Sequence, residues 1–236
     1  MKKTYIYSFP IALLLGFLFN APGYAQNSAT ACITTDIGTP KTSPNIPPEC
    51  PSNSVGVEGL LTPPNLGPEN STHKGYYQLP KSTDGAYMSY SCPAQSWGSK
   101  ELVSVLYTVA QRWKKEHPKG VLMIGDLNAS GHKSHKWGRG VDIQGKTDKG
   151  KWIMKFDAGN YDREATIAFG KMLVDTNHVL NIWYNDPEVN SAILAYAKET
   201  KRSAGMVMKP ITGHDNHFHL DVIQKPDKLG EWEPGC

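Results

Sequence analysis

The stretch from residue 26 to residue 72 is rich in Pro, Ser, Thr and Asn and has no apolar periodicity. Proline fixes φ and removes a backbone donor, so strings such as TSPNIPPECPSN (42–53) and LTPPNLGPEN (61–70) disfavour both helix and sheet. We expect this stretch to be an extended arm and not a second domain. Regular structure therefore has to come from the residues after it, starting near Tyr76.

The first 25 residues have the three-part pattern of a secretory signal peptide. Lys2 and Lys3 give a positive start, residues 10–19 form a short apolar run, and small residues precede a cleavage site after Ala25. A membrane anchor is the alternative, but a span needs about 20 apolar residues and this run is roughly half as long. We therefore expect a signal peptide at residues 1–25 and export to the periplasm, with secretion beyond the cell also open.

Cysteine count and charge limit the expected partners. Four cysteines in an exported chain favour two disulfides, with three possible pairings, and the lack of a C-x-x-C pair argues against a cysteine metal site. They are Cys32, Cys50, Cys92 and Cys236. Free buried thiols are the alternative. The net charge is +3 without any basic block, so nucleic acid is not an expected partner. No segment after the signal peptide is apolar enough to span a membrane, and the oligomeric state stays open.

Three helices and several strands are predicted between Tyr76 and Ile223. Each helix is preceded by a side chain that can accept hydrogen bonds from its first turn. The helices follow Ser99, Asp162 and Asp186 and run to about Glu116, Asn177 and Thr200. Short apolar or alternating runs predict strands at residues 121–124, 139–144, 151–156, 179–184 and 217–223.

Strands and helices follow one another without strict alternation, which is typical of the α+β class. We expect a single domain at residues 73–236, with a central, mostly antiparallel sheet flanked by helices and preceded by the Pro-rich extended arm. The roughly 210 residues that remain after signal removal are enough for one domain with a sizeable core.

Two short histidine clusters lie far apart in the chain. The second, GHDNHFHLDV (213–222), reads as a strand. Successive side chains of a strand alternate between its faces, so His217 and His219 point the same way, about 7 Å apart. One of these imidazoles can bind a metal ion while the other faces substrate or water. Polar surface is the alternative for an H-x-H pair on its own.

The first cluster is GHKSHKWGRGVDI (131–143). His135 and Asp142 are seven residues apart, with Gly138 and Gly140 between them to let the chain turn, so a loop histidine and a strand carboxylate can converge. Two histidines and one aspartate with a fourth position open form a typical catalytic zinc site. We therefore predict one Zn²⁺ per chain, held by His135, Asp142 and His219. Adventitious metal binding by a histidine-rich loop is the alternative.

The strings GDLNASGHKSHKWGRGVDI (125–143) and GHDNHFHLDV (213–222) resemble the two signature blocks of the penicillin-insensitive murein endopeptidases. That family belongs to the wider group of lysostaphin-type, D-Ala-D-Ala-peptidase and hedgehog-like zinc proteins. The wider group shares the H-x6-D and H-x-H patterns, whereas His132 and His214 are the extra histidines of the narrower family. VLNIWYND (179–186) is similar to the strand between the blocks.

The resemblance implies the same zinc ligands and assigns roles to three further histidines. His217 would be the catalytic base, and His132 and His214 would line the site. Some relatives carry a glutamate before the H-x-H ligand, which acts as their general base. This chain has no glutamate there, so His217 is the expected general base. The implied activity is hydrolysis of D-alanyl-diaminopimelate cross-bridges in peptidoglycan. A D,D-carboxypeptidase, an antibacterial effector and a non-catalytic zinc-bearing cell-wall-binding module are the alternatives.

Several residues near the clusters have two interpretations each. Trp137 is either a wall of the substrate cleft or a core aromatic. Arg139 is either a partner for a substrate carboxylate or, as we favour, a solvated arginine at a strand end. Asp215 is either an orienting carboxylate or a turn residue. Trp183 and Tyr184 are neighbours in one strand, so at most one of them can line the cleft.

Overall fold

The computed structural model describes residues 59–203, 205–226, 228–232 and 234–235. The predicted signal peptide and most of the predicted arm lie outside these residues. The described part of the arm, residues 59–72, consists of turns and irregular backbone. All described residues belong to one compact unit of the chain, residues 50–236.

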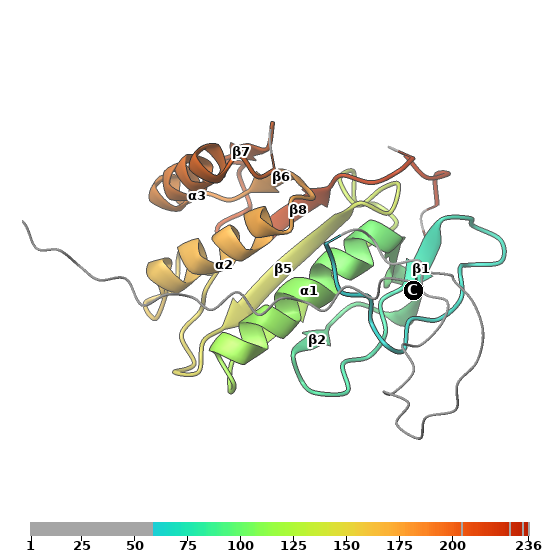
Figure 1. Ribbon diagram of the computed structural model, residues 1–236, viewed down its shortest axis with the longest axis horizontal. Helices are drawn as coiled ribbons and strands as arrows, with labels where there is room; N and C mark the ends of the chain where they lie inside the picture. Colours follow the sequence, from blue (N-terminus) through green and yellow to red (C-terminus); the bar gives the residue numbers. More distant parts are fainter. Residues whose placement is uncertain (1–58, 204, 227, 233, 236) are drawn as a thin grey trace, which may run out of the picture. The chain divides into compact units, whose positions relative to one another are not determined.

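A six-stranded sheet forms the centre of this unit (Figure 1), with the strand order β2-β4-β5-β8-β6-β7. The three inner pairs are antiparallel and the two outer pairs, β2 with β4 and β6 with β7, are parallel. The predicted α+β fold with a mostly antiparallel sheet is therefore confirmed. The strands are Tyr87–Ser89 (β2), Val121–Ile124 (β4), Gly140–Lys146 (β5), Val179–Trp183 (β6), Val207–Lys209 (β7) and Phe218–Val222 (β8). Two more strands, Tyr76–Gln78 (β1) and Trp97–Ser99 (β3), pair with each other in a separate small sheet.

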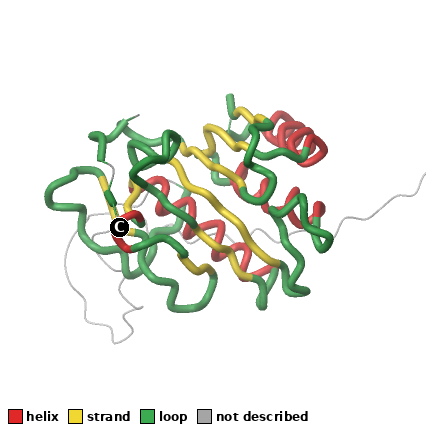
Figure 2. The backbone as a smooth tube through the Cα atoms, turned by 180° about the vertical axis from the view of Figure 1, so that it is seen from behind, coloured by secondary structure: helices red, strands yellow, loops and turns green. Residues whose placement is uncertain are grey.

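Three helices lie on one face of the sheet. Figure 1 shows α1 and α2 in front of β5, and the view from behind in Figure 2 shows the strands in front of the helices. The helices are Lys100–Glu116 (α1), Arg163–Asp175 (α2) and Pro187–Thr200 (α3), and a short 3-10 turn, Pro93–Gln95 (η1), precedes β3. All three predicted caps are confirmed, because the side chains of Ser99, Asp162 and Asp186 each accept a backbone hydrogen bond from the first helical turn.

Strand alternation separates the core from the polar face of the sheet. On β8 the side chain of Phe218 points to the helices, where its ring lies 6.3 Å from that of Phe169 on α2. Phe169 in turn packs edge-on against Trp113 of α1 at 5.7 Å. The next residue, His219, and its neighbour on β5, Asp142, then point to the opposite face. The predicted ligands of the two strands therefore lie on the side of the sheet away from the helices.

The prediction of a strand at residues 151–156 is wrong. Only Trp152 forms bridges there, one with Lys146 and one with Tyr161. The adjacent residues Ile153 and Met154 are both fully buried, which an extended strand on a one-sided core cannot achieve, so the chain bends instead. The edge strands β2 and β7 were not predicted, because three residues are too few to show a period.

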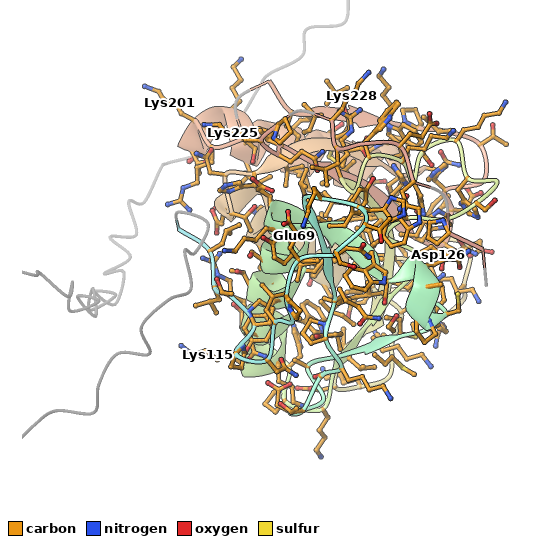
Figure 3. The ribbon with its side chains drawn as sticks, turned by 90° about the vertical axis from the view of Figure 1, so that its right-hand side faces the viewer. Glu69, Lys115, Asp126, Lys201, Lys225 and Lys228 are labelled. Atoms are coloured by element: carbon orange, nitrogen blue, oxygen red, sulfur yellow. The ribbon has the colours of Figure 1, made fainter. Side chains whose placement is uncertain are left out.

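Cys92 is the one cysteine among the described residues, and it is disulfide-bonded. Which pairing the four cysteines adopt stays a prediction, since Cys32, Cys50 and Cys236 lie outside the described part. In that part no helix is long and apolar enough to cross a bilayer. Charges are dispersed over the surface: Figure 3 shows Lys115 on α1, Lys201 at the end of α3 and Lys225 near the C-terminus, with Glu69 between them.

Candidate metal centre

Asp142 and His219 are placed opposite each other by the strand register. β5 and β8 are antiparallel, and Asp142 pairs directly with His219. Side chains of such a pair stand on the same face of the sheet, and Asp142 Oδ1 lies 3.0 Å from His219 Nδ1. On the other side of β8, Trp183 of β6 pairs with His219, and its ring stacks on the imidazole at 4.3 Å. The three side chains therefore form one row across three strands.

His135 completes a triangle of lone-pair atoms. It comes from the loop before β5, and its Nε2 lies 3.1 Å from Asp142 Oδ1 and 3.2 Å from His219 Nδ1. Both imidazoles are almost fully buried, with 1% and 0% of their side chains exposed. His135 Nδ1 is also buried and has no hydrogen-bond partner among the described residues. The three atoms that converge here, two imidazole nitrogens and one carboxylate oxygen, can each offer a lone pair. A single proton cannot be shared by all three atoms, whereas a cation can bind all of them. The triangle could therefore hold a metal ion.

Gly138 and Gly140 allow the loop that carries His135 to reach the sheet. Gly138 has a φ of 70°, in the left-handed region that glycine adopts without strain. At Gly140 a methyl group would lie 2.7 Å from the carbonyl oxygen of Ser134 and 3.2 Å from Asp221 Oδ1. A larger residue at Gly140 would push this loop away from β5, and His135 would leave the triangle.

His132 lies at the outer edge of the centre. It is exposed, its ring centroid is 4.8 Å from that of His135, and one ligand atom each of His132, His135 and Asp142 lies within 4.8 Å of the others. The spacing among His135, Asp142 and His219 is much tighter. The described geometry therefore makes His132 a neighbour of the triangle and not one of its corners.

The imidazole of His217 also faces the carboxylate of Asp142. His217 precedes β8 by one residue, and its Nε2 lies 3.7 Å from Asp142 Oδ1. Its Nδ1 donates to the side-chain oxygen of Asn216 at 2.7 Å, which leaves the lone pair of the neutral ring on Nε2. Burial lowers the pKa of His217, the Asp142 charge opposes that shift, and neighbouring histidines add to it. A neutral imidazole thus presents an acceptor toward the triangle.

His214 lies beside this imidazole. Its ring is 4.8 Å from that of His217 and meets Trp183 edge-on at 5.4 Å, while its Nδ1 donates to the carbonyl oxygen of Ile211. The six predicted site residues are therefore brought together on one face of the sheet, with Trp183 in contact with two of them. Tyr184 is buried in the core against Phe218, which confirms that only one of the two neighbours can line the site.

Asp221 is a site residue that the sequence interpretation missed. It lies two residues after His219 on the same face of β8, and its Oδ1 is 3.7 Å from His219 Nε2. Its other oxygen accepts a hydrogen bond from Asn181 on β6 at 3.1 Å. The alternation in HFHLD could have predicted this position, since residues 217, 219 and 221 share a face of the strand. A carboxylate behind a ligating histidine orients the ring and raises its basicity.

The favoured interpretation of Arg139 changes, and the contacts of Trp137 favour one of its two open interpretations. Arg139 is not a solvated strand end: its side chain is 19% exposed, its Nε lies 3.9 Å from Asp221 Oδ1, and it stacks over Trp137 at 5.3 Å. Trp137 is half-buried under Arg139 and Lys228 and is therefore not a core aromatic. Asp215 accepts hydrogen bonds from Asn185 and from the amide of Phe156, which is the behaviour of a loop-anchoring residue.

Charge balance at the centre follows from these contacts. Burial by itself would raise the pKa of Asp142, but hydrogen bonds with His135 and His219 and the nearby imidazoles lower it well below its usual range. Burial would lower the pKa of His219, but the carboxylates of Asp142 and Asp221 outweigh it and raise the pKa above the ordinary value. The carboxylate is thus ionised over the whole physiological range.

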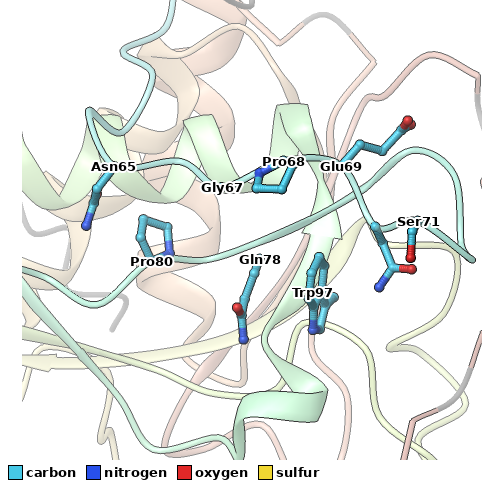
Figure 4. A pocket seen from close by; sticks show the side chains of 9 residues that line it. Asn65, Gly67, Pro68, Glu69, Ser71, Gln78, Pro80 and Trp97 are labelled. Carbon is cyan, nitrogen blue, oxygen red and sulfur yellow. The ribbon is translucent and has the colours of Figure 1, made fainter.

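A separate pocket of about 480 Å³ lies away from these residues (Figure 4). It is lined by Trp97, Gln78 and Pro80 together with the segment from Asn65 to Ser71. None of the six predicted site residues lines this pocket, so it is no part of the candidate centre.

Comparison of the chain with protein-family models and with curated proteins finds no match. The class of site is therefore defined by its own geometry: a cluster of imidazoles and one carboxylate that could hold a metal ion. The murein endopeptidase resemblance of the two sequence blocks stays a prediction.

Proposed function

We propose that this protein is a zinc-dependent peptidoglycan hydrolase that cleaves peptide cross-bridges. The observation that carries the proposal is the triangle of His135 Nε2, Asp142 Oδ1 and His219 Nδ1 with edges of 3.0–3.2 Å. Ligands about 2.0–2.1 Å from a tetrahedral zinc ion are separated by about 3.3 Å, so the triangle fits three corners of such a site. Three protein ligands with one position left for water or substrate are typical of catalytic zinc.

When bound, zinc supplies Lewis acidity, which acidifies water and polarises a carbonyl group. His217 supplies the base, because its unprotonated Nε2 faces the centre and its lowered pKa keeps the ring neutral near pH 7. The same ring can return the proton to the leaving amine. His132, exposed at the rim, can donate a hydrogen bond to the developing oxyanion, and His214 with Trp183 forms the opposite wall.

The substrate class comes from the resemblance of residues 125–143 and 213–222 to the murein endopeptidases. It implies a D-alanyl-diaminopimelate bond. Digestion of purified cross-linked muropeptide dimers and of monomers, followed by mass spectrometry, tests this assignment. We expect zinc-loaded protein to convert dimers to monomers, to leave monomers intact and to stop when a chelator is added. Loss of terminal D-Ala from monomers would instead indicate a D,D-carboxypeptidase, and no product from either would favour a binding module.

The role of His217 is tested with His217→Ala. We expect turnover to fall by about 10²- to 10⁴-fold, the usual contribution of a general base, while zinc content stays near one ion per chain. His178→Ala is the matched control, since His178 lies between α2 and β6 and its imidazole donates to the carbonyl oxygen of Thr176 in its own turn. Wild-type turnover in the His217 variant would refute the mechanism.

A further inference from the structure

Tyr90 lies at the edge of the centre that is opposite Trp183. It follows β2, which pairs in parallel with β4, and its amide donates to the carbonyl oxygen of Ile124 at the end of β4. From there the side chain extends toward β5, which carries Asp142. In the strand order, β2 and β6 are on opposite sides of the β5–β8 pair. Tyr90 and Trp183 therefore border the row of Asp142 and His219 from its two sides.

The tyrosine hydroxyl lies above Gly125, next to the backbone of Asp142. A methyl group at Gly125 would lie 2.5 Å from the Tyr90 hydroxyl oxygen and 3.2 Å from the carbonyl oxygen of Asp142. The amide of Gly125 donates to that same carbonyl at 2.8 Å. Gly125 is not among the glycines with positive φ, so its backbone would accept alanine. What requires a glycine here is room for the Tyr90 ring.

The Tyr90 hydroxyl is available to a ligand. The residue is 55% exposed, and its hydroxyl makes no hydrogen bond within the described part of the chain. Partial burial, followed by the charges of Asp142 and Asp126, raises the pKa of Tyr90 to about 12. The phenol is therefore protonated at neutral pH and can donate a hydrogen bond.

We propose that Tyr90 is a substrate-binding residue whose hydroxyl donates a hydrogen bond to a carbonyl oxygen of the bound peptide on the Asp142 side of the centre. Peptide carbonyls are the acceptors that a substrate of this class presents at regular spacing, and an unpaired phenol beside the metal ligands is suited to bind one. The inference rests on the proposed function for the chemical class of its ligand. It adds a contact from a strand edge that neither histidine block contains.

The test uses Tyr90→Phe, which removes only the hydroxyl, and Gly125→Ala, which displaces it. The control is Tyr107→Phe, since Tyr107 lies on α1, on the helical side of the sheet. Each change is made in zinc-loaded His217→Ala protein, and the Kd for a muropeptide dimer is measured by calorimetry. KM and kcat are measured in otherwise wild-type protein.

We expect Tyr90→Phe to raise Kd and KM by about 2- to 12-fold, the value of one neutral hydrogen bond, with kcat and zinc content unchanged. Gly125→Ala should have a similar effect, and the double variant should be no worse than either, because both remove the same contact. An unchanged Kd for Tyr90→Phe, or multiplied effects in the double variant, would overturn the inference while wild-type cleavage still supports the proposed function. If wild-type protein cleaves nothing, the proposed activity fails, and the Kd series still decides whether Tyr90 binds the peptide.

Discussion

The imidazole of His219 has one carboxylate on each side: Asp142 lies at its Nδ1 and Asp221 at its Nε2. His219 is thus held between two carboxylates, with Nδ1 toward the triangle and Nε2 toward Asp221. Asn181 and Arg139 hold Asp221 in turn. Such an outer carboxylate typically changes metal affinity when it is altered, so its role can be separated from that of the ligands.

We predict that Asp221→Asn lowers zinc affinity by about 10- to 100-fold without unfolding the protein. The amide keeps the shape of the side chain but loses the charge that orients and polarises the His219 ring. Competition titration with a zinc-binding dye measures the change. Asp215→Asn is the matched control, because the Asp215 carboxylate accepts a hydrogen bond from Asn185 and, among the described residues, from none of the three predicted ligands. Equal losses in the two variants would show that position 221 has no special role.

Zinc affinity should also depend on pH through His219. A metal binds only the deprotonated imidazole, and the two carboxylates raise the pKa of His219 in the metal-free protein. As the pH falls through this raised pKa, protons compete with zinc, so affinity should begin to fall at a higher pH than for an ordinary histidine near 6.5. Zinc titrations between pH 8 and pH 5 measure the onset. In Asp221→Asn the onset should move to lower pH, and an unshifted onset would contradict the assigned cause.

At the scale of elements, the helical layer supports the sheet from the face away from the candidate metal centre. α2 and α3 approach closely at Gly170, where an added methyl group would overlap the side chain of Ile193. Gly170 is fully within α2, where glycine has no conformational advantage over alanine. Close packing of the two helices is therefore the reason for glycine at this position.

Gly170→Ala should destabilise the fold by about 1–3 kcal/mol, the usual cost of overpacking a core, despite the better helix propensity of alanine. Urea unfolding measures this change. Gly159→Ala is the control, since a methyl group there meets no atom within 4 Å. Zinc affinity should be unchanged in both variants, because the sheet separates α2 and α3 from the centre. A stabilised Gly170 variant would mean that Ile193 repacks without cost.

At the scale of the whole domain, the centre joins parts of the chain that are far apart in sequence. Asp142 and His219 are 77 residues apart, and His135 and His219 are 84 residues apart. An unfolded chain cannot hold such a site, so metal binding favours the native state. A metal ion bound at the centre would in this sense cross-link the loop before β5 to the sheet.

Zinc at about a thousand times its Kd should therefore stabilise the protein by about 4 kcal/mol. For a domain of this size, this corresponds to a rise in Tm of roughly 8–16 °C. Calorimetry with zinc and with a chelator measures the difference. His135→Ala should abolish it, and His178→Ala should retain it. Equal Tm values for zinc-loaded and chelated wild-type protein would argue against a preformed site.

Sequence alone determined the features that depend on near neighbours. Helix starts at Ser99, Asp162 and Asp186 follow from side chains that cap the next turn, and the alternation around His219 follows from strand geometry. The same local rules placed His135 and Asp142 in one cluster with glycines between them. They failed where tertiary contacts override local preference, as at Ile153 and Met154, where burial of both side chains bends a segment that reads as a strand.

Only the tertiary structure decided which atoms meet. The register of β5 against β8 sets Asp142 opposite His219, and the closure of a loop over Gly140 sets His135 against both. The positions of Asp221, Arg139 and Tyr90 also depend on contacts between strands that the chain order leaves open. Such contacts form only after the entropy of closing long loops has been offset by the packing of the whole domain, so no short stretch of sequence encodes them.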